Sequence, residues 1–164
     1  MIGRGVALFL ALAGLAGTAC ADCTDGAVPK VKWHRCLQDN RMLTGVDLSE
    51  AVLREATFLR SDLSGAILRG ADAYRAKFVS GNLSGTVFDG ARLIEADFSR
   101  ADLTAASFKG SDLRSARFYE ANLRKANFTD ARLERADLRN ADLAGAIWTD
   151  GKRICAESSL GQCN

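Results

Sequence analysis

Large apolar residues recur at every fifth position through most of this 164-residue chain, and a small residue stands two positions before each of them. Residues 93–113 show the pattern with Leu93, Phe98, Leu103, Phe108 and Leu113. An α-helix turns by about 100° per residue, so steps of five scatter around its axis and define no face. In a β-strand an odd step sends successive large residues to opposite faces. The spacing therefore predicts a solenoid that turns after every five residues and returns the same positions inward.

The identity of the large residues predicts four sides in each coil. Leu and Phe alternate through the middle of the chain, so like residues stack only if the number of sides is even. Four sides give one stack with Phe58, Phe78, Phe98 and Phe118, a second with Phe88, Phe108 and Phe128, a third with Leu43 to Leu143 in steps of twenty, and a fourth with Leu53, Ala73, Leu93, Leu113 and Leu133. Glycines also recur with period twenty, at corners of two sides where a positive φ is expected: Gly45, Gly65, Gly85 and Gly145, and Gly70, Gly90 and Gly110.

The five-residue units carry a family resemblance. The units "ADFSR", "ADLTA", "ANLRK", "ADLRN" and "ADLAG" resemble the A(D/N)LxX motif of the pentapeptide repeat family. The resemblance implies an all-β fold, a right-handed quadrilateral β-helix with four pentapeptides per coil. The ends "VKWHRC" and "WTDGKRICAESSLGQC" also resemble those of secreted bacterial members. We divide the chain into a signal peptide (1–21), an N-terminal cap (22–40), the β-helix (41–150) and a C-terminal cap (151–164).

The first 21 residues have the features of an export signal. A short basic start with Arg4 precedes an apolar stretch from Val6 to Ala16, which is too short to span a bilayer. The small residues at 19–21 suit cleavage before Asp22. Two alternatives are a buried N-terminal helix and a lipoprotein anchored at Cys20. We expect an exported protein, periplasmic or secreted, with no membrane attachment unless Cys20 is lipidated.

Removal of Cys20 leaves four cysteines, Cys23, Cys36, Cys155 and Cys163, which lie outside the regular middle of the solenoid. An even number in an exported chain indicates disulfides. Three pairings are open, and proximity along the chain favours Cys23–Cys36 and Cys155–Cys163. Each bond would staple one cap over an otherwise open end of the solenoid.

The sequence contains no recognisable catalytic or cofactor-binding motif. The single histidine, His34, lies close to Cys36, so a metal site that includes Cys23 can be drawn, but a disulfide is the favoured reading. Most aspartates stand just before the central apolar residue of a unit, where hydrogen bonding at a turn explains them. No nucleophile–base pair and no phosphate-binding or dinucleotide fingerprint is present. We therefore expect no enzyme activity, no metal and no cofactor.

Function is then expected on the outside of the solenoid, through an unknown protein partner. The formal net charge is only +2, which argues against a polybasic surface for nucleic acid or anionic membranes. The family's best-understood members mimic DNA and bind gyrase, which confers quinolone resistance. That activity needs a strongly negative rod in the cytoplasm and a dimer made through a C-terminal helix, none of which this sequence indicates. We favour a structural or protein-interaction scaffold and keep the gyrase-binding inhibitor as the alternative.

Outward apolar residues suggest where a partner could bind. Five of them take the position after the central residue on two neighbouring sides and could form one docking strip, or a dimer contact: Leu59, Tyr74, Val79, Ile94 and Tyr119. The alternative is that single exposed apolar residues are normal and need no explanation. The oligomeric state is open.

Overall fold

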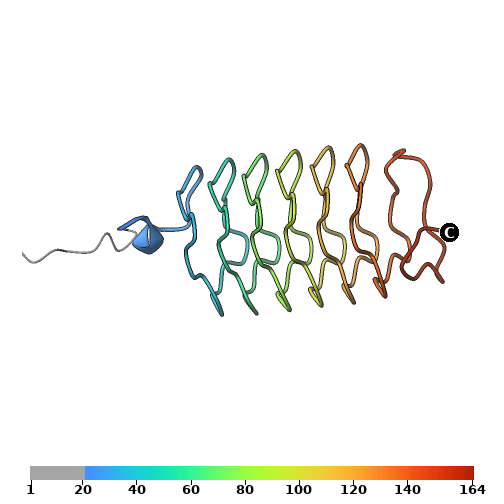
Figure 1. Cartoon of the computed structure of the whole chain (residues 1–164), viewed down its shortest axis with the longest axis horizontal. Coiled ribbons are helices and arrows are strands. Elements are labelled where there is room, and N and C mark those ends of the chain that lie inside the picture. The colour runs from blue at the N-terminus through green and yellow to red at the C-terminus, as the bar shows by residue number, and fades with distance from the viewer. Residues whose placement is uncertain (1–20) are drawn as a thin grey trace, which may run out of the picture.

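The computed structural model describes residues 21–164. Residues 1–20, which hold most of the predicted signal peptide and Cys20, lie outside the described part. A short 3-10 helix, η1 (Ala21–Thr24), precedes a rod of coils stacked along its long axis, with η1 at one end of the rod and the C-terminus at the other (Figure 1). Between residues 21 and 164 no helix is long and apolar enough to cross a membrane.

Each coil has four sides of five residues. Parallel β-bridges join residues twenty apart, from Lys32 and Val52 at one end to Asn127 and Ile147 at the other. Each side contributes one bridged residue per coil, so the sides are single bridges rather than extended strands. The bridges begin at Lys32, inside the segment predicted as the N-terminal cap (22–40). The first coil starts that early because Trp33 and Gln38 already occupy the buried central position.

We number the sides by their central residues and the positions of each unit from one to five. Side 1 contains Leu53, Ala73 and Leu93, and sides 2, 3 and 4 follow in chain order with Phe58, Leu63 and Leu68 at their centres. Positions one and three point inward. Position two makes the bridge to the next coil, and positions four and five form the corner. Sides 1 and 3 are opposite, as are sides 2 and 4.

Every corner places its fifth residue in the left-handed region. At every fifth position from Lys30 to Gly145, φ lies between 54° and 69°. The N–H of the residue after the corner bonds back to the central carbonyl, as in Ala106 to Leu103 at 3.0 Å. A positive φ at the third residue of such a turn defines type II geometry. The glycine corners expected from the sequence are present. The same geometry also occurs on all four sides at residues other than glycine, among them Glu95, Arg60, Ala105 and Asp130. The chain must turn in the same way at every corner.

The inward positions form one continuous core. Leu103 and the phenylalanines of the two aromatic stacks are fully buried. Phe98 lies parallel to Phe78 and Phe118, with ring centroids 5.0 and 5.1 Å away, and edge-on to Phe88 and Phe108. At the C-terminal end Leu133, Leu138 and Trp148 are only partly buried. Identical neighbours therefore fill the interior, and the last coil is the least covered.

Two disulfides close the ends. Cys23 is bonded to Cys36, with 5.4 Å between the Cα atoms, and Cys155 to Cys163, with 4.8 Å. These are the two pairings that proximity along the chain favours. Near the first bond, the Gln38 side-chain amide donates to the Cys23 carbonyl at 3.1 Å and fixes the cap to the first coil.

The C-terminal cap covers only half of the last coil. The chain reverses at Asp150, whose carboxylate accepts the N–H groups of Lys152 and Arg153 at 2.9 and 2.8 Å. These two backbone bonds hold the pKa of Asp150 below its ordinary value. After the reversal the cap forms two antiparallel bridges, Ile147 to Ile154 on side 4 and Asp142 to Leu160 on side 3. Sides 1 and 2 receive no such strand from the described residues.

Candidate functional site

The carboxylates and amides at position two stabilise the coil itself. The Asp102 carboxylate accepts the backbone N–H of Thr104 at 3.0 Å and its hydroxyl at 2.6 Å. Asp62 and Ser64 repeat the arrangement, and the Ser64 hydroxyl and N–H lower the pKa of Asp62. The reading of this ladder as hydrogen bonding at turns is therefore confirmed. These oxygens are committed to the backbone, so they are poor candidates for acid–base chemistry.

Buried side chains from positions one and three fill the interior of the rod within residues 21–164. No group of three histidine, cysteine, aspartate or glutamate side chains in that range could hold a metal ion. The sulfur atoms of Cys23 and Cys36, beside His34, are joined to each other. The chemistry of this part of the chain therefore lies in its surface charge and shape.

The surface as a whole is nearly balanced in charge, but the individual sides of the rod are not. Between residues 31 and 150, side 1 carries eight arginines or lysines and five carboxylates, and side 2 carries five and four. Side 3 carries three and three, and side 4 two and five. The positive excess lies on two neighbouring sides, side 3 is neutral, and the negative excess lies on side 4. Sequence analysis missed this division because it summed the charges along the chain. The position of each charge within the twenty-residue period carries the signal.

On sides 1 and 2 the charges pair from one coil to the next. Five ion pairs join residues twenty apart, with nitrogen–oxygen distances of 2.7 to 3.7 Å: Arg35–Glu55, Arg75–Glu95, Arg92–Asp72, Arg117–Asp97 and Arg132–Asp112. Pairs exposed in this way each contribute about 0–1 kcal/mol. Their main effect is to fix which side chains stand next to one another along each column.

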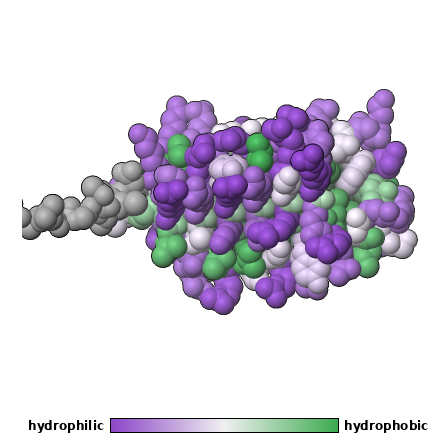
Figure 2. Space-filling view, viewed as in Figure 1, coloured by the Kyte–Doolittle hydropathy of each residue, from purple (hydrophilic) through white to green (hydrophobic). Residues whose placement is uncertain are grey.

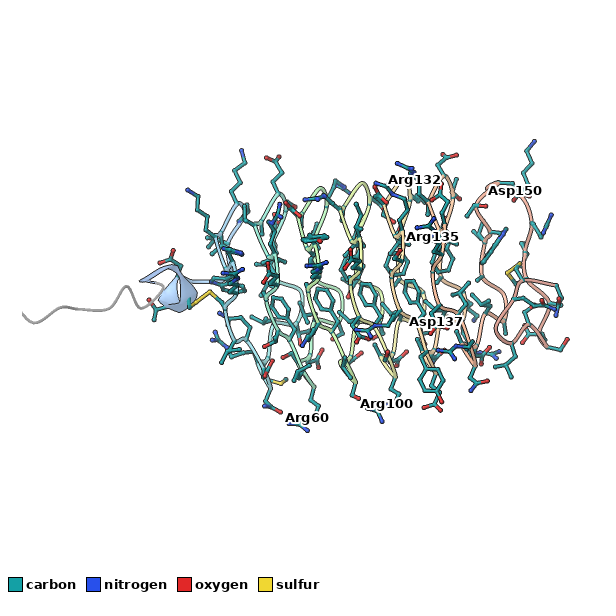
Figure 3. All side chains as sticks on the ribbon, in the orientation of Figure 1. Arg60, Arg100, Arg132, Arg135, Asp137 and Asp150 are labelled. Carbon is teal, nitrogen blue, oxygen red and sulfur yellow. A yellow bond between two sulfur atoms is a disulfide. The ribbon has the colours of Figure 1, made fainter. Side chains whose placement is uncertain are left out.

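Other cations on side 2 have no carboxylate partner in the described part of the chain. Arg60 and Arg100 both occupy position five and lie along one edge of the rod (Figure 3). Arg60 reaches only the side-chain oxygen of Asn40, at 3.3 Å, and Arg100 forms no ion pair with any residue from 21 to 164. Ser80 stands between them in the same column. These guanidinium groups are free to contact an acidic partner.

The predicted apolar strip is divided into two columns. Tyr74 and Ile94 stand at position four of side 1, and Leu59, Val79 and Tyr119 at position four of side 2. Between the columns runs position two of side 2, which includes Lys77 and Arg117. Tyr119 is 37% exposed, and the other four are half-buried. On the face that Figure 2 presents, apolar residues form small separate groups on a hydrophilic surface.

Tyr74 is covered by cations rather than open to a partner. The guanidinium carbons of Arg54, Arg75 and Arg92 lie 5.1, 4.9 and 5.0 Å from the centre of its ring. Cation–π contacts of this kind stabilise the side chains that make them. Tyr74 therefore joins the charged network of side 1. Its role as an aromatic anchor stays a prediction, as does the strip.

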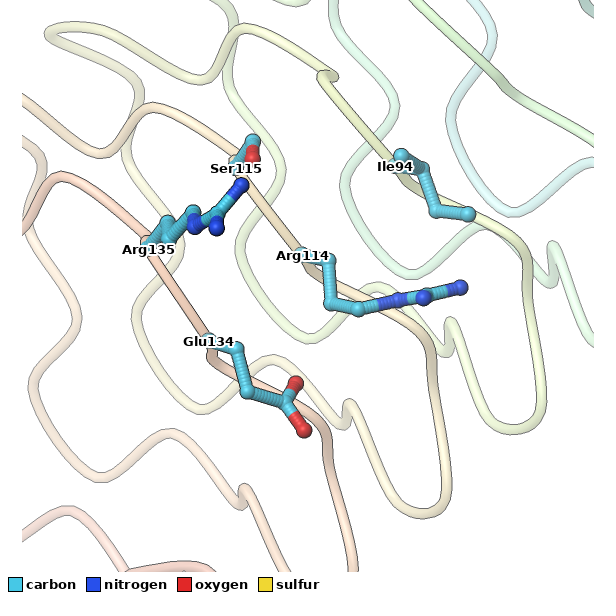
Figure 4. A pocket seen from close by; sticks show the side chains of 5 residues that line it. All are labelled: Ile94, Arg114, Ser115, Glu134 and Arg135. Carbon is cyan, nitrogen blue, oxygen red and sulfur yellow. The ribbon is translucent and has the colours of Figure 1, made fainter.

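A shallow groove lies on side 1, near the C-terminal end of the rod. Its lining is Ile94, Arg114, Ser115, Glu134 and Arg135 (Figure 4), and it encloses about 430 Å³. Asp112 holds the Arg114 guanidinium at 2.7 Å, and this bond lowers the pKa of Asp112. Within residues 21–164, Arg135 has no such carboxylate. The groove thus combines an apolar side chain with an unpaired guanidinium.

Comparison with known proteins places the repeats in a family. The family model described as pentapeptide repeats matches residues 43–79, 81–118 and 116–147, with 8 copies. No curated protein matches the sequence. Among solved structures, the chain is similar to HetL, a pentapeptide repeat protein involved in heterocyst differentiation regulation from the cyanobacterium Nostoc sp. strain PCC 7120. The identity is 33% and the TM-score 0.65, over 75% of this chain and 62% of HetL.

The chain is also similar in fold to QnrB1, a plasmid-mediated fluoroquinolone resistance protein. The identity is 17% and the TM-score 0.52, over 79% of this chain and 76% of QnrB1. At that identity the likeness concerns the fold alone. The chain spans about three fifths of the length of HetL, so neither protein transfers an activity to it.

Proposed function

The chain belongs to the pentapeptide repeat family, and on that premise we propose that it is an exported, non-catalytic scaffold that binds a protein partner on sides 1 and 2. We assign its β-helix the right hand of the family. Each side is flat and regular, so a partner meets the same spacing of side chains from coil to coil. A scaffold of this kind needs no pocket in its core.

The division of charge between the sides carries this proposal. Sides 1 and 2 together hold thirteen basic and nine acidic residues, whereas sides 3 and 4 hold five and eight. Complementary charge raises the association rate and selects the partner's orientation. A partner with an acidic face would therefore meet sides 1 and 2, where Arg60 and Arg100 form no ion pair with any residue from 21 to 164.

Export is supported by the two disulfides. Disulfides persist in oxidising compartments and are rare in the cytosol, and the cysteines that remain after the predicted cleavage form two pairs. The proposed location is the periplasm or the medium, with a lipoprotein anchored at Cys20 as the alternative form. Cell fractionation separates these three possibilities. A secreted protein is found in the medium, a periplasmic protein in the soluble periplasmic fraction, and a lipoprotein with the membranes.

The gyrase-binding inhibitor is not the function we propose. A DNA mimic must be strongly negative along its length, and this chain has a net charge of +2 with a positive excess on two sides. The likeness to QnrB1 does not change this, because it concerns the fold.

A matched pair of variants tests the proposed face. The double variant Arg60→Ser, Arg100→Ser removes two cations from side 2, and Ser80 shows that serine is accommodated in that column. The control Arg69→Ser, Lys109→Ser removes two cations from position four of side 4, where Ser49 already occurs. With the oxidised mature protein as bait in a periplasmic extract, we expect the first variant to lose its captured partner and the control to keep it. Equal capture by both variants would contradict the assignment of the face.

A further inference from the structure

Side 1 of the last coil ends in backbone groups that have lost their usual partners. In the preceding coil the N–H groups of Leu113 and Ser115 donate to Arg132 and Glu134 at 2.9 and 3.0 Å, and the Ser111 carbonyl accepts from Arg132. One coil later the equivalent groups are the N–H of Leu133, the N–H of Arg135 and the carbonyl of Ala131. None of these three has a hydrogen-bond partner within residues 21–164.

The C-terminal cap leaves a step one strand deep at this place. The chain turns back at Asp150 instead of continuing along side 1, and its antiparallel bridges add one layer to sides 3 and 4 only. Side 1 is therefore about one strand spacing, roughly 4.8 Å, lower than the cap. Leu133 is half-buried at the floor of the step, whereas Leu113 in the coil below is fully covered. A single extended strand would fill this space.

The columns of side 1 indicate which residues that strand should carry. Position two alternates in charge along Asp72, Arg92, Asp112 and Arg132, so an acidic residue continues it. Position five runs through Arg75, Glu95 and Ser115 to Arg135, which forms no ion pair within residues 21–164. An acidic residue would complete this column as well. The ion pairs Arg92–Asp72 and Arg75–Glu95 show that such neighbours meet, at 3.2 and 2.7 Å. Above Ala131 and Leu133 a small and an apolar residue complete the core.

We propose that the open edge at 131–135 binds an extended peptide of the pattern small–acidic–apolar–any–acidic, which adds to side 1 as one more parallel strand. The backbone bonds supply affinity and the two acidic residues supply selectivity. This inference rests on the proposed role as a protein-binding scaffold, and it names the segment of the partner that is recognised.

A second copy of this chain fits the edge poorly. Its first coil would bring Lys32 over Arg132 and Arg35 over Arg135, which places like charges in adjacent coils. The cap layer on sides 3 and 4 would also meet that coil before side 1 does. Charge and shape both favour a separate strand with acidic residues.

The test uses a capped synthetic peptide, Gly-Ala-Asp-Leu-Lys-Glu-Gly, and the oxidised mature protein. Amide hydrogen exchange by NMR is followed at Leu133 and Arg135, with Leu113 and Ser115 as internal controls. We expect the first two amides to gain at least ten-fold protection at saturating peptide and the controls to change little. The charge-exchanged peptide Gly-Ala-Lys-Leu-Glu-Lys-Gly should bind at least ten-fold more weakly. In the variant Arg135→Glu, the two peptides should differ less in affinity. The fold should tolerate this change, because glutamate already occupies position five of side 1 at Glu55 and Glu95.

Three results would overturn the inference. The first is unchanged exchange at both edge amides with millimolar peptide, and the second is equal protection by the two peptides. The third is protection that rises with protein concentration alone, which would make a second copy the occupant. The peptide assay and the pull-down with the Arg60 and Arg100 variant are independent, because the peptide assay needs no cell extract. If the peptide does not bind but the pull-down identifies a partner on sides 1 and 2, only the inference about the edge is wrong. Conversely, if the peptide binds and no partner is captured from the extract, the inference about the edge at 131–135 stands and the proposed partner face on sides 1 and 2 is wrong.

Discussion

Truncation of one ring in the middle of the aromatic stacks should cost a large part of the stability of the rod. Phe98 is fully buried, stacks on Phe78 and Phe118 and meets Phe88 and Phe108 edge-on. Replacement of a buried phenylalanine by alanine costs about 3–5 kcal/mol. The neighbours above and below are held by their own coils and cannot collapse into the gap. We therefore expect Phe98→Ala near the upper end of that range and Phe98→Leu, which keeps most of the volume, at about 1–2 kcal/mol.

Urea unfolding followed by far-UV circular dichroism measures these losses. Tyr119→Ala is the matched control, because this ring stands outside the core and is 37% exposed. Its change should stay within about 0.5 kcal/mol. A loss below about 1 kcal/mol for Phe98→Ala, or a loss as large for Tyr119→Ala, would refute the assignment of inward and outward positions.

Three further predictions follow from the same geometry. Leu103→Arg buries an unpaired charge between two coils and should abolish cooperative folding, whereas the outward Thr104→Arg should leave the melting temperature within a few degrees of wild type. Opening the C-terminal staple with the double change Cys155→Ser, Cys163→Ser should lower the free energy of unfolding by about 2–3 kcal/mol in urea titrations, and an unreduced digest of the wild type should show that bond by mass spectrometry. Two hydrogen bonds from the Arg139 guanidinium hold the pKa of Asp137 at about 2, below its ordinary 3.8. The contribution of this carboxylate to the free energy of unfolding should therefore be complete above about pH 4 and be lost as the pH falls toward about 2. A melting temperature that stays constant down to about pH 2 would contradict this.

The repetitive part of the fold could be predicted from the sequence alone. A spacing of five excludes both regular secondary structures, and the alternation of leucine and phenylalanine requires an even number of sides. The residues assigned inward, such as Phe58 and Leu83, are fully buried, and the position-two ladder bonds to its own turns as expected. Each of these features depends on residues within a single unit. The sequence repeats the unit many times, so the pattern can be recognised from the sequence alone.

The missed features depend on how coils stack and where the stacking stops. A left-handed corner at Arg60 or Glu95 carries no local signal, because neither residue type favours positive φ. The charge division between sides requires each residue's place in the twenty-residue period. The open edge at Leu133 exists because the cap folds back over sides 3 and 4, which spacing along the chain does not reveal.

Site-specific photo-crosslinking tests the proposed binding face most directly. A photoreactive phenylalanine analogue is placed at Ser80 on side 2, between Arg60 and Arg100, and, in a second protein, at Lys109 on side 4. Each protein is then irradiated in the exporting cells. We expect a discrete crosslinked partner from position 80 and none from position 109. Crosslinking from position 109 alone, or equally from both positions, would contradict a partner face on sides 1 and 2.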